Sequence, residues 1–97
     1  MSKFADFLRE HQRLVILRVL AEMPAYRSNS SVLSQALTSY GLEATRDQTK
    51  SEIHWLAEQG LVRVEDLDSI LIVTLTERGG DAASGRAIIP GIKRPGA

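Results

Sequence analysis

The sequence predicts a mainly α-helical fold with one small β-hairpin, in the order helix, helix, helix, strand, strand, helix. Apolar residues recur at helical spacing in three stretches of the first 60 residues. A run rich in β-branched residues follows from Leu61 to Leu75, divided by the polar pair Asp68 and Ser69. With 97 residues, 43% of them hydrophobic, the chain has the size and composition of a single globular domain.

The first helix is expected over residues 3–23, where apolar residues recur at threefold and fourfold spacing. From Leu14 to Leu20 this helix is apolar on nearly all sides, which is typical of a helix buried over most of its surface. We therefore expect a central helix, a subunit interface, or both. Pro24 ends the helix because the residue before a proline is pushed away from helical angles.

The second helix is expected to follow a polar connector at residues 26–31. Asn29 or Ser30 can cap it, since a side-chain oxygen at that position accepts from a free backbone N–H. Gly41 stands where a left-handed residue commonly ends a helix. The apolar residues between these points recur on one face.

The third helix is expected to begin at Thr45, which forms a capping box with Gln48, and to end at Gly60. With Ile53 at the centre of the buried face, a rotation of about 100° per residue also points Thr49 and Leu56 inward. Lys50 and His54 then lie on the flanks of this helix. The opposite side carries a polar set with one aromatic residue: Asp47, Gln48, Ser51, Trp55 and Glu58.

The strands are expected at residues 61–67 and 70–75, and Thr76 caps a short last helix from Glu77 to about Gly85. A two-stranded hairpin is marginal alone in water, so it must pack on the helices. Three helices followed by a hairpin form the winged helix-turn-helix layout. We assign residues 1–87 to this domain. Residues 88–97, with two prolines and two glycines, are expected to be an extended, solvated C-terminal tail.

Composition excludes several classes of function. The chain has no cysteine and only two histidines, so we expect no disulfide, no metal site and no thiol nucleophile. It has no phosphate-binding glycine loop and no nucleophile motif, so we expect no cofactor and no enzymatic activity. With no long apolar run and no signal segment, the chain is expected to be cytoplasmic and to avoid membranes.

Charge argues against a strong phosphate-binding surface. Twelve basic residues balance twelve acidic ones, whereas nucleic-acid-binding domains usually carry a basic surplus. Both ends of the chain are mildly basic and the middle is mildly acidic. The expected hairpin tip carries Glu65, Asp66 and Asp68 against Arg63 alone, so this wing is not expected to grip DNA.

Two segments carry a resemblance to known proteins. Arg46–Lys50 followed by Trp55–Val62 resembles winged-helix regulators of the broad ArsR/MarR type, whose third helix ends in a similar Gly-Leu-Val junction. More narrowly, Arg13–Arg18, Arg46–Val62 and Pro90–Pro95 together resemble a family of small winged-helix proteins from Mu-like bacteriophages and prophages. The resemblance implies a winged-helix fold and a phage or prophage origin, hence the cytoplasm of a bacterial host. It implies no particular biochemical role.

If the chain reads DNA, the exposed start of the third helix enters the major groove. The candidate DNA-binding residues are Arg46, Asp47, Gln48, Lys50, Ser51 and His54. Gln48 can pair with adenine, Arg46 with guanine or phosphate, and Lys50 and Ser51 with phosphate. The alternative interpretation is that these residues only begin a well-capped, solvated helix.

The sequence therefore predicts a homodimeric winged-helix protein that binds double-stranded DNA as a phage transcriptional regulator or DNA-transaction factor. The dimer interface is expected on the apolar first helix, with help from the last helix or the tail. The alternative is a winged-helix protein-protein interaction module without DNA binding, which the neutral net charge favours. Trp55 is expected to lie against its own chain, a second subunit or a partner protein.

Overall fold

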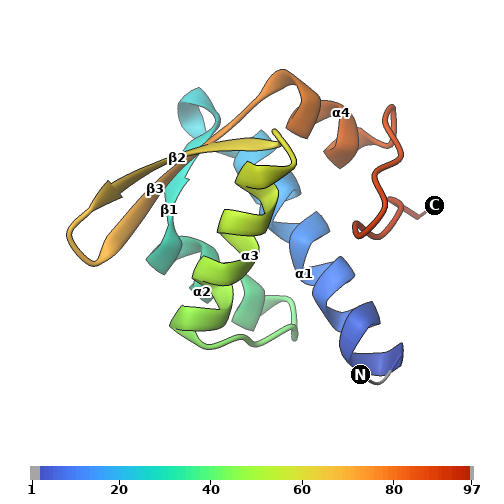
Figure 1. Cartoon of the computed structure of the whole chain (residues 1–97), viewed down its shortest axis with the longest axis horizontal. Helices are drawn as coiled ribbons and strands as arrows, with labels where there is room; N and C mark the ends of the chain where they lie inside the picture. The colour runs from blue at the N-terminus through green and yellow to red at the C-terminus, as the bar shows by residue number, and fades with distance from the viewer. Residues whose placement is uncertain (1–2, 97) are drawn as a thin grey trace.

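Helix α1 (Lys3–Glu22) is the longest element of the computed structural model, which describes residues 3–96. Its apolar middle is buried inside its own chain, and Leu17 and Leu20 have no exposed surface. The prediction of a central helix is confirmed, and packing within the chain accounts for the apolar surplus of this middle part. The first turns of α1 extend beyond the other elements (Figure 1), and there Phe4, Phe7 and Leu8 are exposed.

Helices α2 (Ser30–Ser39) and α3 (Arg46–Glu58) begin and end with the local devices that the sequence predicts. The side chain of Asn29 accepts a 2.9 Å hydrogen bond from the Val32 N–H and so caps α2. After α2 the chain turns at Gly41, whose φ is +74°. The N–H of Leu42 then donates to the Leu37 carbonyl at 2.8 Å, which satisfies a carbonyl of the last turn.

The sheet has three strands, one more than the sequence predicts. β2 (Val62–Leu67) and β3 (Ile70–Leu75) form the expected hairpin. A short 3-10 helix, η1 (Pro24–Tyr26), ends at the start of the expected connector at residues 26–31, and the middle of that connector is instead strand β1 (Arg27–Asn29). β1 pairs antiparallel with the other edge of β3, giving the order β1-β3-β2. Three residues are too few to show strand periodicity, and β1 forms because β3 offers it an unpaired edge.

Helix α4 (Glu77–Ser84) closes the fold after the hairpin. Thr76 caps it through a 3.0 Å hydrogen bond from the Gly79 N–H, and Gly85 ends it with a φ of +86°. Gly79 lies directly against the backbone of Leu61, where any side chain would collide with the Leu61 carbonyl oxygen. This close approach joins α4 to the start of β2.

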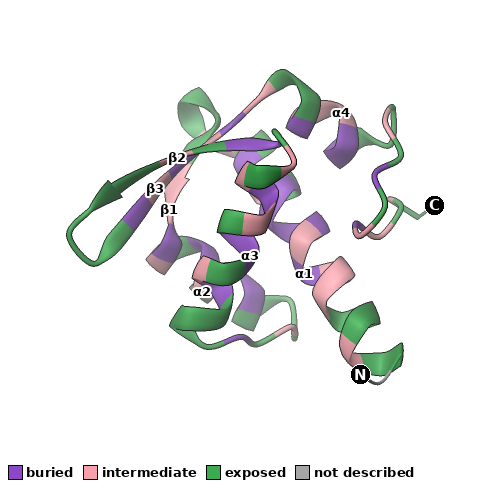
Figure 2. Cartoon of the chain, in the orientation of Figure 1, coloured by how far each residue is buried: buried purple, intermediate pink, exposed green. Residues whose placement is uncertain are grey.

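The described segment after α4, residues 85–96, has no helix or strand, but it is not fully solvated. Ile89 and Ile92 are buried in the hydrophobic core that also contains Leu17 and Leu20 of α1, which we call the core cluster. The Lys93 N–H donates to the Glu10 carbonyl of α1 at 3.2 Å. Figure 2 shows buried residues within this otherwise exposed segment. The expectation of a fully solvated tail is therefore wrong, because Ile89 and Ile92 bury their side chains against the core.

Three helices, a β-hairpin with one added edge strand, and a last helix make this a winged helix-turn-helix fold, as predicted. The hairpin stands beside α3 and extends away from the helices (Figure 1). Over residues 3–96, no helix combines the length and the hydropathy needed to cross a lipid bilayer.

Candidate nucleic-acid interface

Helix α3 is fixed at its start by a complete capping box. The Gln48 N–H donates to the Thr45 side chain at 3.0 Å, and the Thr45 N–H donates to Gln48 Oε1 at 2.9 Å. The buried hydroxyl of Thr49 donates to the Thr45 carbonyl at 2.9 Å. Ile53 and Leu56 are fully buried, as predicted. The inner face of α3 is therefore anchored, and its other side chains are displayed at defined angles.

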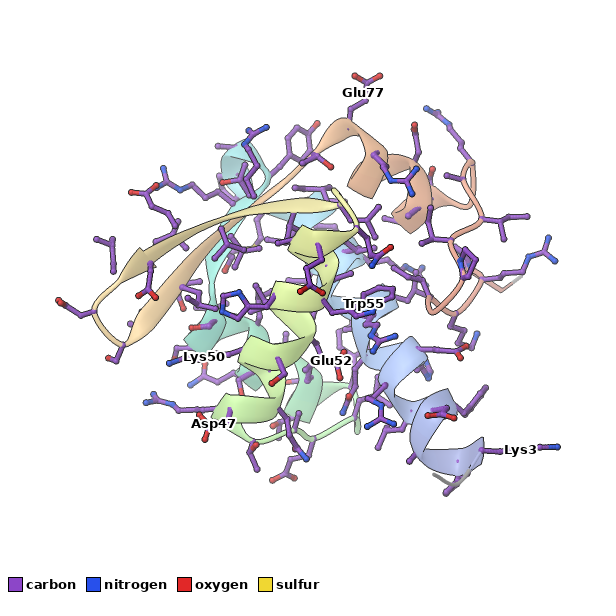
Figure 3. All side chains as sticks on the ribbon, in the orientation of Figure 1. Lys3, Asp47, Lys50, Glu52, Trp55 and Glu77 are labelled. Carbon is purple, nitrogen blue, oxygen red and sulfur yellow. The ribbon has the colours of Figure 1, made fainter. Side chains whose placement is uncertain are left out.

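Three basic side chains of α3 form one row at intervals of four residues. Arg46, Lys50 and His54 are separated by about 40° each around the helix axis, so they share one flank. We call this row the basic stripe. Arg46 and His54 are exposed, and within residues 3–96 no member of the stripe forms an ion pair with a carboxylate. Figure 3 shows that Lys50 leaves α3 on the side of the hairpin, opposite to Trp55.

Lys50 also joins α3 to the hairpin. Its Nζ donates a 2.6 Å hydrogen bond to the carbonyl of Ser69, in the turn between β2 and β3. Asp68, the other residue of this turn, has a φ of +57°. The tip of the hairpin is thus held against the stripe.

The opposite flank of α3 lines a groove between α3 and the first half of α1. The groove has a volume of about 850 Å³. Its walls include five carboxylates and two arginines: Asp6, Glu10, Glu43, Asp47, Glu52, Arg9 and Arg13. Arg9 pairs with Asp6 at 2.9 Å and Arg13 with Glu52 at 2.6 Å, so the arginines are already neutralised. This side of α3 repels phosphate.

The ion pair between Arg13 and Glu52 is largely buried, and the sequence analysis did not anticipate it. Glu52 is 6% exposed, although the inward face predicted around Ile53 does not include it. Arg13 Nε donates to Glu52 Oε1 and thereby links α1 to α3. The available signal was the position of Arg13 directly before the apolar run that begins at Leu14, since a charge beside a buried stretch requires a partner.

Trp55 lies against its own chain, the first of the three alternatives. The Arg13 guanidinium stacks 3.9 Å from the centroid of the indole ring, and Trp55 packs against the core cluster. Gly91 of the C-terminal segment also lies against the indole ring. A Cβ atom built on Gly91 would lie 2.7 Å from Cζ2 of Trp55. Trp55 is therefore half-buried rather than solvated.

The hairpin carries little basic surface, as the sequence analysis expects. Arg63, Glu65, Asp66 and Asp68 are all exposed, and the carboxylates lie on the strand end and the turn. Arg27 of β1 adds a cation that the hairpin alone lacks, but it lies 3.8 Å from Glu65. The wing therefore offers no surplus of positive charge.

The six candidate DNA-binding residues thus divide between two flanks of α3. The structure brings Arg46, Lys50 and His54 together on the hairpin side. The other three, Asp47, Gln48 and Ser51, line the acidic groove. Gln48 Oε1 also accepts the capping-box hydrogen bond from the Thr45 N–H. Among residues 3–96, no three histidine or carboxylate side chains are grouped so as to hold a metal ion.

Two curated proteins are similar to this chain over most of its length. The uncharacterised protein gp26 of Escherichia phage Mu is 49% identical over 90 residues, which is 93% of each chain. An uncharacterised protein of Haemophilus influenzae is 38% identical over 76 residues, covering 77% of this chain and 74% of its own. No family model matches the sequence.

Solved structures share the fold. RosR of H. salinarum superposes with a TM-score of 0.63 and 25% identity, over 75% of this chain and 66% of RosR. The MarR family transcriptional regulator Sco3205 of Streptomyces coelicolor, solved in complex with DNA, gives a TM-score of 0.57 and 24% identity. That alignment covers 77% of this chain and 48% of Sco3205. The winged-helix assignment is therefore supported independently of the element order.

Proposed function

The chain belongs to the family of the Escherichia phage Mu protein gp26, and we propose that it binds double-stranded DNA through the basic stripe of α3. Its role would be that of a phage or prophage transcriptional regulator or DNA-transaction factor. The fold permits this function, since the regulator Sco3205 shares it and was solved with DNA. The fold alone does not decide it, because one scaffold serves many functions.

The observation that carries the proposal is the separation of charge across α3. Arg46, Lys50 and His54 lie on one flank without a carboxylate partner in the described chain. The carboxylate of Glu52 lies toward the groove and is paired with Arg13, whereas Asp47 leaves the first turn of α3 on the side of Lys50 (Figure 3). A chain of zero net charge can still present a local cationic surface to phosphate in this way.

In this arrangement the exposed start of α3 enters the major groove with the stripe toward one phosphate backbone. Arg46 can reach a guanine edge or a phosphate, and Lys50 can reach a phosphate. The groove side of α3 then faces away from the DNA, so we assign Asp47, Gln48 and Ser51 a lesser part than the stripe. For Gln48 and Ser51 to contact bases, α3 would have to enter the major groove with its N-terminus pointing almost directly at the bases.

We also propose that the chain acts as a homodimer through the start of α1. Phe4 is 82% exposed, and Phe7 and Leu8 lie beside it, a larger apolar cluster than a solvated helix end usually shows. A symmetric pairing of two α1 helices would cover all three residues. In a dimeric helix-turn-helix protein, the two recognition helices address half-sites about one turn of DNA apart.

The test is DNA affinity measured as a function of salt. Binding of mixed-sequence DNA should weaken steeply as salt rises, because each phosphate contact releases about 0.9 counterions. Arg46→Ala combined with Lys50→Ala should lower the slope of log affinity against log salt by about one for each lost contact. The affinity is measured by fluorescence anisotropy of a labelled duplex from about 50 to 200 mM salt, the range over which phosphate contacts change the affinity strongly.

A matched control removes the same charge elsewhere. Arg18 on α1 and Arg86 after α4 are both exposed and lie away from the stripe, so Arg18→Ala with Arg86→Ala should leave the slope unchanged. Equal slopes for the two double variants would show that net charge, not the stripe, governs binding. Absence of binding by the wild-type chain at about 50 mM salt would exclude the DNA proposal, since electrostatic binding is strong there. Light scattering tests the dimer, which a monomer at high concentration would refute.

The groove favours a second candidate, a protein-interaction role without DNA binding. It is carboxylate-rich, it is large enough for several side chains, and it occupies the flank of α3 that faces α1. Such a surface would take a basic segment of a partner protein. The salt titration separates the two roles, because only the DNA role depends on Arg46 and Lys50.

A further inference from the structure

The C-terminal segment meets α3 at a single glycine. Gly91 has a φ of +94°, and a Cβ at this position would lie 2.7 and 2.8 Å from Cζ2 and Cη2 of Trp55. The same Cβ would lie 3.2 Å from Arg13 Nη1. Both the backbone angle and the contact therefore require glycine here. The backbone of the segment is seated directly on the indole ring.

Several anchors hold Gly91 in this place. Arg13 Nη1 donates a 2.9 Å hydrogen bond to the Gly91 carbonyl while its Nε is bound to Glu52. Ile89 and Ile92, on either side of Gly91, are buried in the core cluster. One arginine of α1 thus binds both α3 and the segment, and both Arg13 and Gly91 lie against the ring of Trp55.

We propose that Gly91 and Trp55 are positioning residues, through which the C-terminal segment sets the orientation of α3 for DNA binding. This inference rests on the proposed function. The inner face of α3 is fixed by Ile53 and Leu56, and its edge toward α1 is held by Glu52 through Arg13, which also binds the Gly91 carbonyl. Trp55 lies on the same edge of α3, so we expect its contact with Gly91 to contribute to the angle at which the basic stripe is presented. Neither Gly91 nor Trp55 touches DNA.

Gly91→Ala is the direct test. The added methyl group displaces the segment from the ring, so the single tryptophan of the chain becomes more accessible to acrylamide. DNA affinity should fall by about tenfold, the scale on which overpacking perturbs a fitted contact. Circular dichroism on the same samples establishes that the variant remains folded.

Gly41→Ala is the matched control. Gly41 also has a positive φ, +74°, but nothing lies within 4 Å of a Cβ built there. This variant carries a comparable backbone strain without any contact to α3. We expect a lower melting temperature with unchanged acrylamide quenching and unchanged DNA affinity. A loss of DNA affinity equal to that of Gly91→Ala would mean that reduced stability is the cause, and would overturn the positioning role.

A second variant covers the case in which Gly91→Ala unfolds the chain. Trp55→Phe removes the ring atoms that the Cβ would meet, so in this background Gly91→Ala keeps only the backbone strain and the approach to Arg13, and should cost less further DNA affinity than it does in the wild-type chain. If the double variant lost as much DNA affinity as the sum of the two single variants, the positioning role would be overturned. If the wild-type chain binds DNA and Gly91→Ala binds it with the same affinity, the positioning role is overturned and the proposed function stands. Absence of wild-type DNA binding would overturn both.

Discussion

Lys50 Nζ lies 2.6 Å from the Ser69 carbonyl oxygen, so one side chain of α3 holds the turn of the hairpin. An ammonium group has three donors. Lys50 can therefore keep this bond and still donate to a phosphate. The position of the wing and the charge of the basic stripe consequently depend on the same residue.

Lys50→Met removes both the tie and the charge while keeping a long apolar stem. Amide hydrogen exchange near Ser69 should become faster, because the turn loses its bond to α3. Stability should change by less than about 1 kcal/mol, since the bond is exposed. The slope of DNA affinity against salt should fall by about one per chain. Lys50→Arg keeps the charge and should retain the slope, whereas equal slopes in all three proteins would exclude a phosphate contact by Lys50.

The boundaries of the helices could be predicted because they depend on neighbouring residues. Asn29, Thr45 and Thr76 cap the helices that follow them, and Gly41 ends α2, as expected. Each of these devices is complete within about four residues. The element order, and with it the winged-helix fold, follows from them.

The contacts that shape the site could not be predicted in the same way, because their partners are far apart in the chain. Arg13 and Glu52 are 39 residues apart, and Arg13 and Gly91 are 78 apart. Helical spacing places Glu52 near the edge of the buried face of α3, and only the position of α1 makes it buried. The sequence therefore identified the polar face of α3 but not its division into a basic stripe and an acidic groove.

The two adjacent glycines of α4 should respond in opposite ways to alanine. A Cβ on Gly79 would collide with the Leu61 carbonyl oxygen, so Gly79→Ala must displace β2 or α4. We expect a loss of several kcal/mol or failure to fold, as for other severe overpacking. A Cβ on Gly80 meets only Leu75 at 3.9 Å, an ordinary contact. Gly80→Ala should stabilise the chain by up to about 1 kcal/mol through helix propensity.

Urea denaturation of both variants checks this pair. The wild-type chain provides the reference midpoint, and an unchanged slope of unfolding free energy against urea would show that only stability has changed. A Gly79→Ala variant as stable as Gly80→Ala would contradict the close packing of α4 on Leu61.

The two arginine pairs of α1 should differ in their contribution to stability. Arg13→Met leaves the buried carboxylate of Glu52 without a partner and should destabilise the chain by about 3–5 kcal/mol. Asp6→Asn breaks the exposed pair with Arg9 and should cost less than about 1 kcal/mol. Urea unfolding measures both. Adding Glu52→Met to Arg13→Met should recover much of the loss, and a further loss would contradict an unpaired buried charge as the cause.

His11 should make the folded chain less stable as the pH falls below about 6.5. Burial, with the positive charges of Lys93 and Arg18, lowers the pKa of His11 from its ordinary value of 6.5. Between the lowered pKa and 6.5 the unfolded chain binds more protons, so the free energy of unfolding rises with pH across this interval and is unaffected above it. NMR titration of the His11 ring should give a midpoint below 6.5. His11→Gln should remove this part of the fall in melting temperature between pH 7 and pH 5, the range in which histidine titrates. A midpoint at or above 6.5 would contradict the combined effect of burial and of the positive charges of Lys93 and Arg18 on His11.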